Sequence, residues 1–432
     1  MKPISSILFF GALLLLASCS APVLGGLGKK NYHDQYARKL TDAGLKATVM
    51  GQQWFTAAEK ALVSPQTVTL PYRQAGYFAP DQPRAVGLRF TGQRGAKLIF
   101  RLETKALDTF RLYTDLWRSE SDGSPKLILS MDSSAGQFTH EIEDEDEVLV
   151  LRLQPELLGG GEYTLSISVG PSLAFPVAGG KARIGSIWGD PRDAGARRHE
   201  GIDIFAPRST PVIAAADGTV HRVGDNNLGG KVIFLRPKGK NLSLYYAHLD
   251  SQLVSSGDRV SVGDTIGLVG NTGNARTTPP HLHFGIYAMG GAINPYTFVA
   301  PDVKQPGRIS ILLEELKSYY RTTKDIKVGE TTLARHTLLL ATDVNSHSLL
   351  AQTPDRKTVT LPVSSVQRVD NQLRNTKIRD TIPLLSAPHP SAPQKKELLP
   401  GVPVRVLGYY NEFAFVSGEA QEQGWIPRSQ VR

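Results

Sequence analysis

Four of the chain's ten histidines, together with Asp203, stand in short motifs between positions 199 and 283. They belong to three short motifs, which read His-Glu-Gly-Ile-Asp from His199 to Asp203, Tyr-Ala-His-Leu around His248, and His-Leu-His from His281 to His283. Three side chains of these types can hold a zinc ion and leave one position open for water, while two further imidazoles remain to move protons. The motifs therefore contain the parts of a catalytic zinc site.

The residues around the first motif favour a strand over a helix. Gly201, Ile202 and Pro207 are poor material for a helix, so we expect His199 and Asp203 to leave a loop and enter a strand.

The third motif predicts the directions in which its histidines point. Positions two apart on a strand share a face, so His281 and His283 are expected to face the same way while Leu282 points into the core. Pro279 and Pro280 set the angle at which the chain enters this strand. One imidazole can then bind the metal while the other stands beside the attacking water. The alternative is a set of five unrelated polar side chains, since a single histidine is most often structural.

With these motifs, the stretch from about Gly185 to Phe298 resembles the lysostaphin-type (LytM-type) peptidoglycan metallo-endopeptidases. The resemblance rests on six runs of sequence, namely Arg198–Ile204, Ala216–Val220, Tyr246–Leu249, Val262–Asp264, Val269–Gly273 and His281–Phe284. It covers about a quarter of the chain, and the motifs are specific in combination.

The resemblance implies that His199, Asp203 and His283 hold one zinc ion per chain and that His248 and His281 assist catalysis. Which of the last two takes the proton of water, and which stabilises the oxyanion or protonates the leaving amine, stays open. Some relatives have a tyrosine shortly before the first ligand. This chain reads Pro-Arg-Asp-Ala-Gly there, so substrate contacts on that side are expected to differ.

Two other functions compete with a zinc-dependent wall endopeptidase. A non-catalytic envelope scaffold that activates another wall hydrolase predicts a damaged metal set, whereas this chain keeps all five positions. A general secreted metalloprotease usually carries a helical His-Glu-x-x-His pair, which the sequence lacks. Two histidines and one aspartate also fit zinc better than calcium or magnesium, which prefer shells made only of oxygen.

The N-terminus predicts export and a lipid anchor. Residues 1–18 read as a secretory signal, with Lys2 before an apolar run from Ile7 to Leu16 that is too short for a good membrane span. The run ends in Leu-Ala-Ser-Cys, which resembles a bacterial lipobox and makes Cys19 the predicted lipidation site. Because Cys19 is the only cysteine, no disulfide can form within one chain. Ordinary cleavage near Ala17 beside an incidental cysteine is the alternative.

The charge of the chain is consistent with this location. A formal net charge of +9 suits peptidoglycan, whose stem peptides carry carboxylates. Nucleic acid is a poor partner because no block of Lys and Arg with interleaved aromatic residues occurs. We therefore predict a bacterial lipoprotein in the cell envelope, on the outer face of a membrane, in the periplasm or at the cell surface. The oligomeric state and the scissile bond do not follow from the sequence.

The length and patterning predict a mainly β, multidomain protein. The expected order is a signal peptide (1–18), a tether and helical segment (19–65), a β-sandwich (66–172), a strand-rich zinc metallo-endopeptidase domain (173–300), a connector (301–322) and two small SH3-like β-barrels (323–372 and 373–432).

Periodicity supports the first of these units. Apolar residues recur at three- and four-residue steps from Asn31 to Val63, which predicts one or two amphipathic helices with Trp54 in the core. Short strands separated by turn signals follow and predict the sandwich; the expected strands are 85–90, 97–102, 110–116, 148–153 and 163–169. The acidic run 141–147 predicts a solvated loop, with a calcium site as the alternative. His221 lies outside the motifs, and we expect a structural role for it.

A weak internal repeat predicts the two C-terminal modules. Residues 361–366 echo residues 426–431, and the second copy resembles bacterial SH3-like modules. Trp425 with Tyr409 and Tyr410 could form an aromatic surface for wall peptide, or these side chains could fill the interior of the module.

Overall fold

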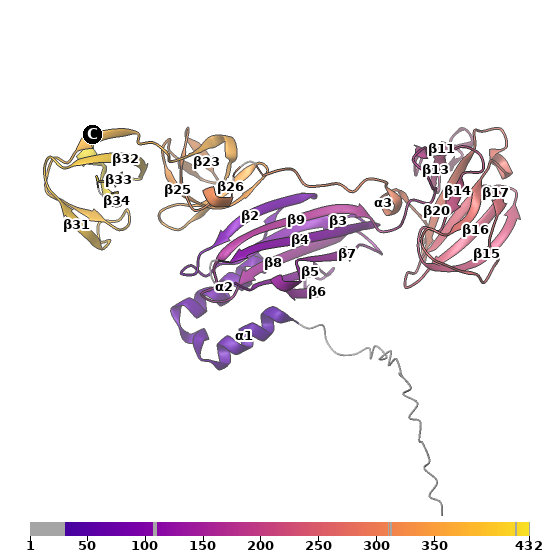
Figure 1. Ribbon diagram of the computed structural model, residues 1–432, viewed down its shortest axis with the longest axis horizontal. Helices are drawn as coiled ribbons and strands as arrows, with labels where there is room; N and C mark the ends of the chain where they lie inside the picture. Colours follow the sequence, from indigo (N-terminus) through magenta and orange to yellow (C-terminus); the bar gives the residue numbers. More distant parts are fainter. Residues whose placement is uncertain (1–30, 107–109, 310, 312, 420, 432) are drawn as a thin grey trace, which may run out of the picture.

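The computed structural model describes residues 31–106, 110–309, 311, 313–419 and 421–431. Cys19 and the predicted signal peptide lie outside the described residues. The described chain is mainly β, as predicted, and is elongated, with sheets at its two ends and a sandwich between them (Figure 1). Among the described residues, no helix combines the length and apolar character needed to cross a membrane.

Two helices precede the strands and confirm the predicted helical segment. They are α1 (Tyr32–Asp42) and α2 (Val49–Val63), joined by a short 3-10 turn. Asn31 caps α1 by accepting from the backbone N–H of Asp34, and Thr48 caps α2 in the same way. Trp54 is buried against the sandwich and donates its indole N–H to a backbone carbonyl at 2.8 Å. The prediction of a core tryptophan is therefore confirmed.

The central sandwich consists of two sheets packed face to face over a core of Leu, Ile and Phe side chains. The first sheet has the strand order β1 (Gln66–Thr67), β3 (Val86–Gly92), β8 (Glu147–Pro155), β5 (Leu112–Ser119) and β6 (Pro125–Asp132). The second contains β2 (Tyr72–Phe78), β9 (Gly161–Pro171), β4 (Ala96–Ala106) and β7 (Gln137–Glu141). The five expected strands are present as β3, β4, β5, β8 and β9, and β1, β2, β6 and β7 complete the two sheets.

Part of the acidic run is neutralised by the protein itself. The Nζ atom of Lys240 lies 2.7 Å from a carboxylate oxygen of Glu141 and 2.5 Å from one of Glu143. Arg94 donates its backbone N–H to Asp146. Residues 143–146 are exposed, as a solvated loop predicts, although a lysine from the next sheet pairs with Glu141 and Glu143.

The region predicted as the first SH3-like barrel continues the second sheet of the sandwich. Its strands are β22 (Tyr319–Thr322), β23 (Ile326–Val328), β24 (Thr331–Leu333), β25 (Leu338–Asn345), β26 (Ser348–Gln352), β27 (Thr358–Pro362) and β28 (Val366–Arg368). Strand β25 pairs antiparallel with β2, and β22 already begins inside the predicted connector. Local patterning could not reveal this pairing, because its two strands are far apart in the sequence.

The last region forms a sheet of six strands. They are β29 (Arg374–Lys377), β30 (Ile382–Leu385), β31 (Gln394–Leu398), β32 (Pro403–Tyr410), β33 (Phe413–Ser417) and β34 (Gln423–Pro427). Trp425 is buried beside Phe415 and Leu338, so this tryptophan serves the interior and not an aromatic surface. The assignment of both C-terminal regions to the SH3-like class stays a prediction.

The sheet that carries the three motifs lies at the other end of the molecule (Figure 1). Its strands are β10 (Arg183–Ser186), β13 (Ile202–Phe205), β14 (Pro211–Ile213), β15 (Gly218–Asn226), β16 (Gly230–Pro237), β17 (Ser243–Gln252), β18 (Arg259–Val260), β19 (Thr265–Val269), β20 (His281–Ala288) and β21 (Gly291–Ile293). A small hairpin of β11 (Pro191–Arg192) and β12 (Arg197–Arg198) precedes β13, and α3 (Tyr296–Val299) follows β21.

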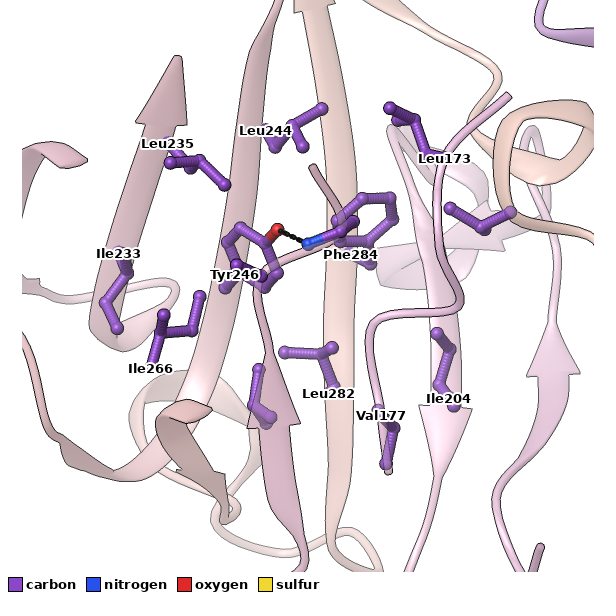
Figure 2. Packing of buried hydrophobic residues seen from close by; sticks show 14 of the residues in the cluster. Leu173, Val177, Ile204, Ile233, Leu235, Leu244, Tyr246, Ile266, Leu282 and Phe284 are labelled. Carbon is purple, nitrogen blue, oxygen red and sulfur yellow. Dashed lines mark hydrogen bonds between the residues drawn. The ribbon is translucent and has the colours of Figure 1, made fainter. Parts of the chain in front are cut away.

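One face of this sheet is a closed hydrophobic core (Figure 2). Tyr246, Leu282 and Phe284 are fully buried there, and the backbone N–H of Ala215 donates to the Tyr246 hydroxyl at 3.0 Å. Because side chains alternate along a strand, the residues between these positions point to the opposite face. The inward position of Leu282 confirms the predicted alternation and leaves the histidines of the third motif on that outer face.

Candidate metal centre and its groove

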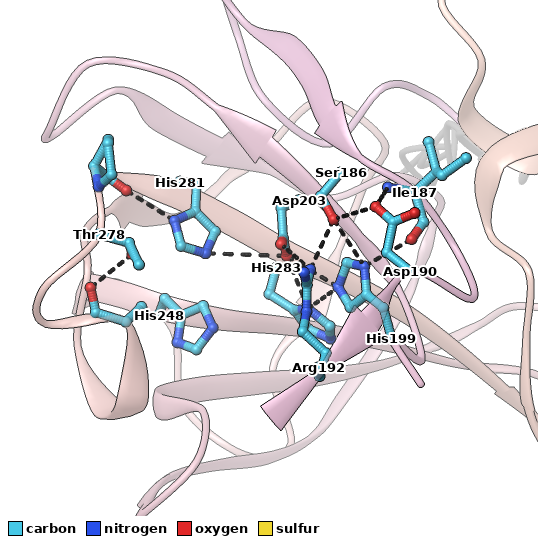
Figure 3. Close-up of polar contacts among 12 residues, drawn as sticks. Ser186, Ile187, Asp190, Arg192, His199, Asp203, His248, Thr278, His281 and His283 are labelled. Atoms are coloured by element: carbon cyan, nitrogen blue, oxygen red, sulfur yellow. Dashed lines mark hydrogen bonds and ion pairs between the residues drawn. The ribbon is translucent and has the colours of Figure 1, made fainter. Parts of the chain in front are cut away.

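Three side chains from the first and third motifs meet on the outer face of the sheet (Figure 3). Asp203 on β13 lies opposite His283 on β20 in the antiparallel register. Its Oδ1 atom is 3.1 Å from Nε2 of His199 and 3.1 Å from Nδ1 of His283, and these two nitrogens are 3.0 Å apart. Two imidazoles and a carboxylate therefore present one atom each to a common point.

This triangle fits the chemistry of a zinc site. Zinc bonds of about 2.0–2.1 Å in tetrahedral geometry place neighbouring ligand atoms about 3.3 Å apart. The observed separations of 3.0–3.1 Å are close to that value. Two imidazole nitrogens and a carboxylate oxygen at such distances need a shared proton or a cation between them. We therefore treat the triangle as a candidate metal centre.

Backbone contacts fix the orientation of the first candidate ligand, His199. The outer nitrogen Nδ1 of His199 lies 2.9 Å from the carbonyl oxygen of Ile187. A carbonyl only accepts, so Nδ1 carries the proton and Nε2 presents its lone pair to the centre. The backbone of His199 is itself tied to Gly189 and Asp190 by two hydrogen bonds of 2.9 Å.

Gly201 makes room for the third candidate ligand, His283. A Cβ atom at Gly201 would lie 2.6 Å from Cε1 of His283 and 2.7 Å from the carbonyl oxygen of Phe284. Any other residue at Gly201 would push against the imidazole that faces Asp203. The glycine of the first motif therefore has a steric reason to stand two residues after the first ligand.

His248 and His281 stand beside the triangle and face the same space (Figure 3). Nδ1 of His248 lies 2.9 Å from the carbonyl oxygen of Thr272, and Nδ1 of His281 lies 2.8 Å from that of Pro279. In the neutral form of each ring the proton therefore sits on Nδ1, which leaves Nε2 able to accept a proton. Their ring centres are 5.0 Å apart, and Nε2 of His281 is 4.0 Å from Oδ1 of Asp203.

The backbone is unusual at His248. Its φ angle is 62°, in the left-handed region that non-glycine residues rarely adopt. Strand β17 also loses regular register with β16 and β19 next to this residue. Strict alternation would send His248 to the same side as the buried Tyr246. The left-handed turn brings it instead to the groove face, next to Ala247, so a strained backbone places this candidate proton carrier in the groove.

Burial governs the ionisation of the cluster. It lowers the pKa of His248 to about 4, and positive charge on His283 and His281 would lower this pKa further. Burial would raise the pKa of Asp203, but a proton shared with His199 and His283, and the positive charge that it brings, outweigh burial and hold this pKa well below its usual range. Burial also lowers the pKa of His283. At neutral pH the cluster therefore contains a carboxylate and at least two neutral imidazoles.

The centre lies in a groove with a volume of about 1090 Å³. Phe234, Tyr245 and Tyr287 form an aromatic part of its lining on the outer face of the sheet. His221 also lines the groove and bonds to the hydroxyl of Ser243 at 2.9 Å. The sequence does not show that His221 borders the groove, and its structural role stays a prediction.

Comparison with known proteins agrees with this geometry. Residues 197–295 match Peptidase family M23. The chain carries an M23 peptidase domain. An uncharacterized metalloprotease of Haemophilus influenzae is 43% identical to the chain over 115 residues, which make up 26% of this chain and 22% of that protein. ShyC, named a peptidoglycan DD-endopeptidase of Vibrio cholerae, is 38% identical over 108 residues, or 25% of this chain and 24% of ShyC.

Solved structures also resemble the M23 domain. The catalytic domain of lysostaphin from Staphylococcus simulans has 32% sequence identity with a TM-score of 0.25, over 27% of this chain and 90% of that domain. The chain spans less than half of the length of the curated relatives that it matches.

The M23 domain also contains contacts that sequence reasoning missed. Arg192, on β11, donates through Nη2 to Oδ2 of Asp203 at 2.6 Å and to the hydroxyl of Ser186 at 2.7 Å. The sequence drew attention to this segment only because a tyrosine of some relatives is replaced there. A basic residue shortly before a ligand carboxylate was the available signal, and it is weak, since arginines near aspartates are common on protein surfaces.

Proposed function

We propose that this protein is a zinc-dependent endopeptidase that hydrolyses peptide bonds in peptidoglycan. The observation that carries the proposal is the convergence of His199, Asp203 and His283 within 3.1 Å, beside two further histidines with free Nε2 atoms. The match to Peptidase family M23 covers this whole cluster and supports the reaction class. The name of ShyC supports peptidoglycan as the substrate.

In this proposal His199 Nε2, Asp203 Oδ1 and His283 Nδ1 hold the zinc ion. When bound, zinc polarises the scissile carbonyl and makes the attacking water more acidic. Nε2 of His248 or His281 accepts the proton of that water, because the Nδ1 atom of each ring is already committed to a backbone carbonyl. The imidazole that has taken this proton then carries it on Nε2, from where it can stabilise the oxyanion or protonate the leaving amine.

The groove suits an extended peptide. Both histidines of the proton-transfer pair line it, and its wall includes Leu228 and Asn274 from the segments that follow β15 and β19. Aromatic side chains at Phe234 and Tyr245 give it an apolar floor that a substrate can cover. Because the site lies in a groove and not in an enclosed cavity, it favours a chain that runs through it over a small molecule that it would enclose.

Mass analysis of fragments released from purified peptidoglycan tests the function. Full-length protein should release fragments whose masses show hydrolysed peptide bonds, a chelator should stop the release, and added zinc should restore it. His199→Ala protein serves as the matched control. Casein treated in parallel separates the alternatives: comparable cleavage of casein would indicate a general protease, and no release by zinc-loaded protein would indicate a scaffold.

We further propose that the protein is exported and anchored through Cys19, with peptidoglycan and the membrane as its partners. The lipobox-like run behind an apolar segment supports this proposal. Cys19→Ser should move the protein from the membrane fraction to the soluble fraction. Mass spectrometry of the mature N-terminus should find a lipidated Cys19, and an unmodified start at another residue would contradict the anchor.

A further inference from the structure

The two oxygens of the Asp203 carboxylate have separate partners. Oδ1 faces the candidate metal centre, 3.1 Å from Nε2 of His199 and 3.1 Å from Nδ1 of His283. Oδ2 faces away from it and accepts a hydrogen bond of 2.6 Å from Nη2 of Arg192. A carboxylate can ligate zinc through one oxygen or through both, so a strong donor on Oδ2 bears directly on this choice.

Arg192 does not hold Asp203 alone, because a network behind it limits its movement (Figure 3). Its Nη2 atom also donates to Oγ of Ser186 at 2.7 Å, and that hydroxyl donates to Asp190 at 2.8 Å. Asp190 in turn accepts from the backbone N–H of Ile187 at 2.9 Å. The carbonyl of Ile187 is the group that binds Nδ1 of His199. One short segment, residues 186–192, therefore supports two of the three candidate ligands.

We propose that Arg192 is a positioning residue that keeps Asp203 a single-oxygen ligand of the metal. With Oδ2 engaged by the guanidinium, only Oδ1 remains for the ion, so a position stays open for water and substrate. The charge of Arg192 also offsets that of a carboxylate buried beside two imidazoles. This inference rests on the proposed metal centre.

A second arginine–aspartate pair in the same domain provides a control. Arg208 donates to Oδ1 of Asp250 at 2.7 Å, a contact similar in length to that of Arg192 with Asp203. The side chains of Arg208 and Asp250 are 55% and 32% exposed, whereas those of Arg192 and Asp203 are 33% and 11% exposed. In the described part of the chain, Arg208 and Asp250 lie outside the lining of the groove. Loss of this pair removes a surface ion pair and nothing from the metal centre.

The test measures zinc affinity by competition with a chromophoric chelator in wild-type, Arg192→Gln, Arg192→Lys and Arg208→Gln proteins. Arg192→Gln should bind zinc about 10–100-fold more weakly, which is the usual cost of losing an outer partner of a metal ligand. Arg192→Lys keeps one positive donor and should recover part of the affinity. Arg208→Gln should match the wild type. Thermal unfolding of the zinc-free proteins checks that all four are folded.

Cobalt provides a second readout that does not depend on catalysis. The visible absorption bands of cobalt weaken as its coordination number rises. If Asp203 gains a second metal bond when Oδ2 is released, cobalt-loaded Arg192→Gln should therefore absorb visible light more weakly than wild type. Wild-type zinc affinity together with a wild-type cobalt spectrum in Arg192→Gln would overturn the inference but leave the metal centre intact. Failure of the wild-type protein to bind zinc would instead overturn the proposed function.

Discussion

Two buried aspartates in this molecule are each paired with an arginine, yet their surroundings differ. In the sandwich, Asp343 on β25 accepts from both Nη atoms of Arg84 at 2.8 and 2.9 Å and from the hydroxyl of Tyr163 at 2.5 Å. Gln74 completes that network at 3.4 Å. In the M23 domain, Asp203 has an arginine on one oxygen only, and its other oxygen faces imidazole nitrogens and a groove.

The difference shows how a structural polar network can be told from a functional one. Around Asp343, donors surround the carboxylate, and the network joins β2, β9 and β25 across a long gap in sequence. Around Asp203, Oδ1 and one nitrogen each from His199 and His283 are acceptors that converge on one point and require a proton or a cation there. A buried carboxylate therefore indicates little by itself, whereas lone pairs that converge beside an open groove indicate a ligand.

Loss of a candidate ligand should have the largest effect. His199→Ala or Asp203→Ala removes one of three converging atoms, so we expect no stoichiometric zinc and no measurable hydrolysis. Elemental analysis of the purified variants measures the metal, and release of fragments from peptidoglycan measures the activity. Full zinc occupancy in Asp203→Ala would show that Asp203 is not a zinc ligand and that its contrast with Asp343 has been misinterpreted.

Loss of a proton carrier should abolish most activity without loss of metal. His248→Ala and His281→Ala leave the triangle intact, and general acid–base groups contribute roughly a hundred- to ten-thousand-fold to rate. We expect zinc content like that of wild type and a lower kcat by about this factor. If either variant lost zinc as completely as His199→Ala does, the altered histidine would be a metal ligand and not a proton carrier.

Disruption of the sandwich network should affect stability and spare the chemistry. Asp343→Ala leaves Arg84 buried without its carboxylate, which typically costs about 3–5 kcal/mol in the free energy of unfolding. Urea denaturation measures this cost. The double variant Arg84→Met with Asp343→Leu removes both charges and should be less destabilised. Loss of zinc from folded Asp343→Ala protein would contradict the view that this network is purely structural.

A fall in pH from 7 to 5.5 should have the smallest of these effects on kcat. With a pKa of about 4, His248 stays mostly neutral as the pH falls from 7 to 5.5, and it loses its capacity to accept a proton only near pH 4. An ordinary histidine, with a pKa near 6.5, would instead be about 90% protonated at pH 5.5. We expect less than a twofold loss of kcat over this range, measured together with zinc content. A tenfold loss at constant zinc content would contradict the lowered pKa.

The sequence by itself determined much of the local structure around the site. The two-residue period of a strand places His281 and His283 on one face with Leu282 buried, and this follows from backbone geometry alone. Gly201, Ile202 and Pro207 disfavour a helix after the first histidine, and Asp203 accordingly lies on a strand. The helices of residues 31–63 and five sandwich strands follow from similar short-range patterns.

Tertiary structure alone decided how these parts meet. The register of β13 against β20 brings Asp203 opposite His283, and a left-handed φ angle turns His248 toward them, although neither feature leaves a periodic trace in the sequence. Arg192 reaches Asp203 because the 186–192 segment folds back over β13, and β25 joins β2 across more than two hundred residues. Short-range patterns record which face a residue prefers, whereas pairing between distant segments depends on the packing of the whole chain.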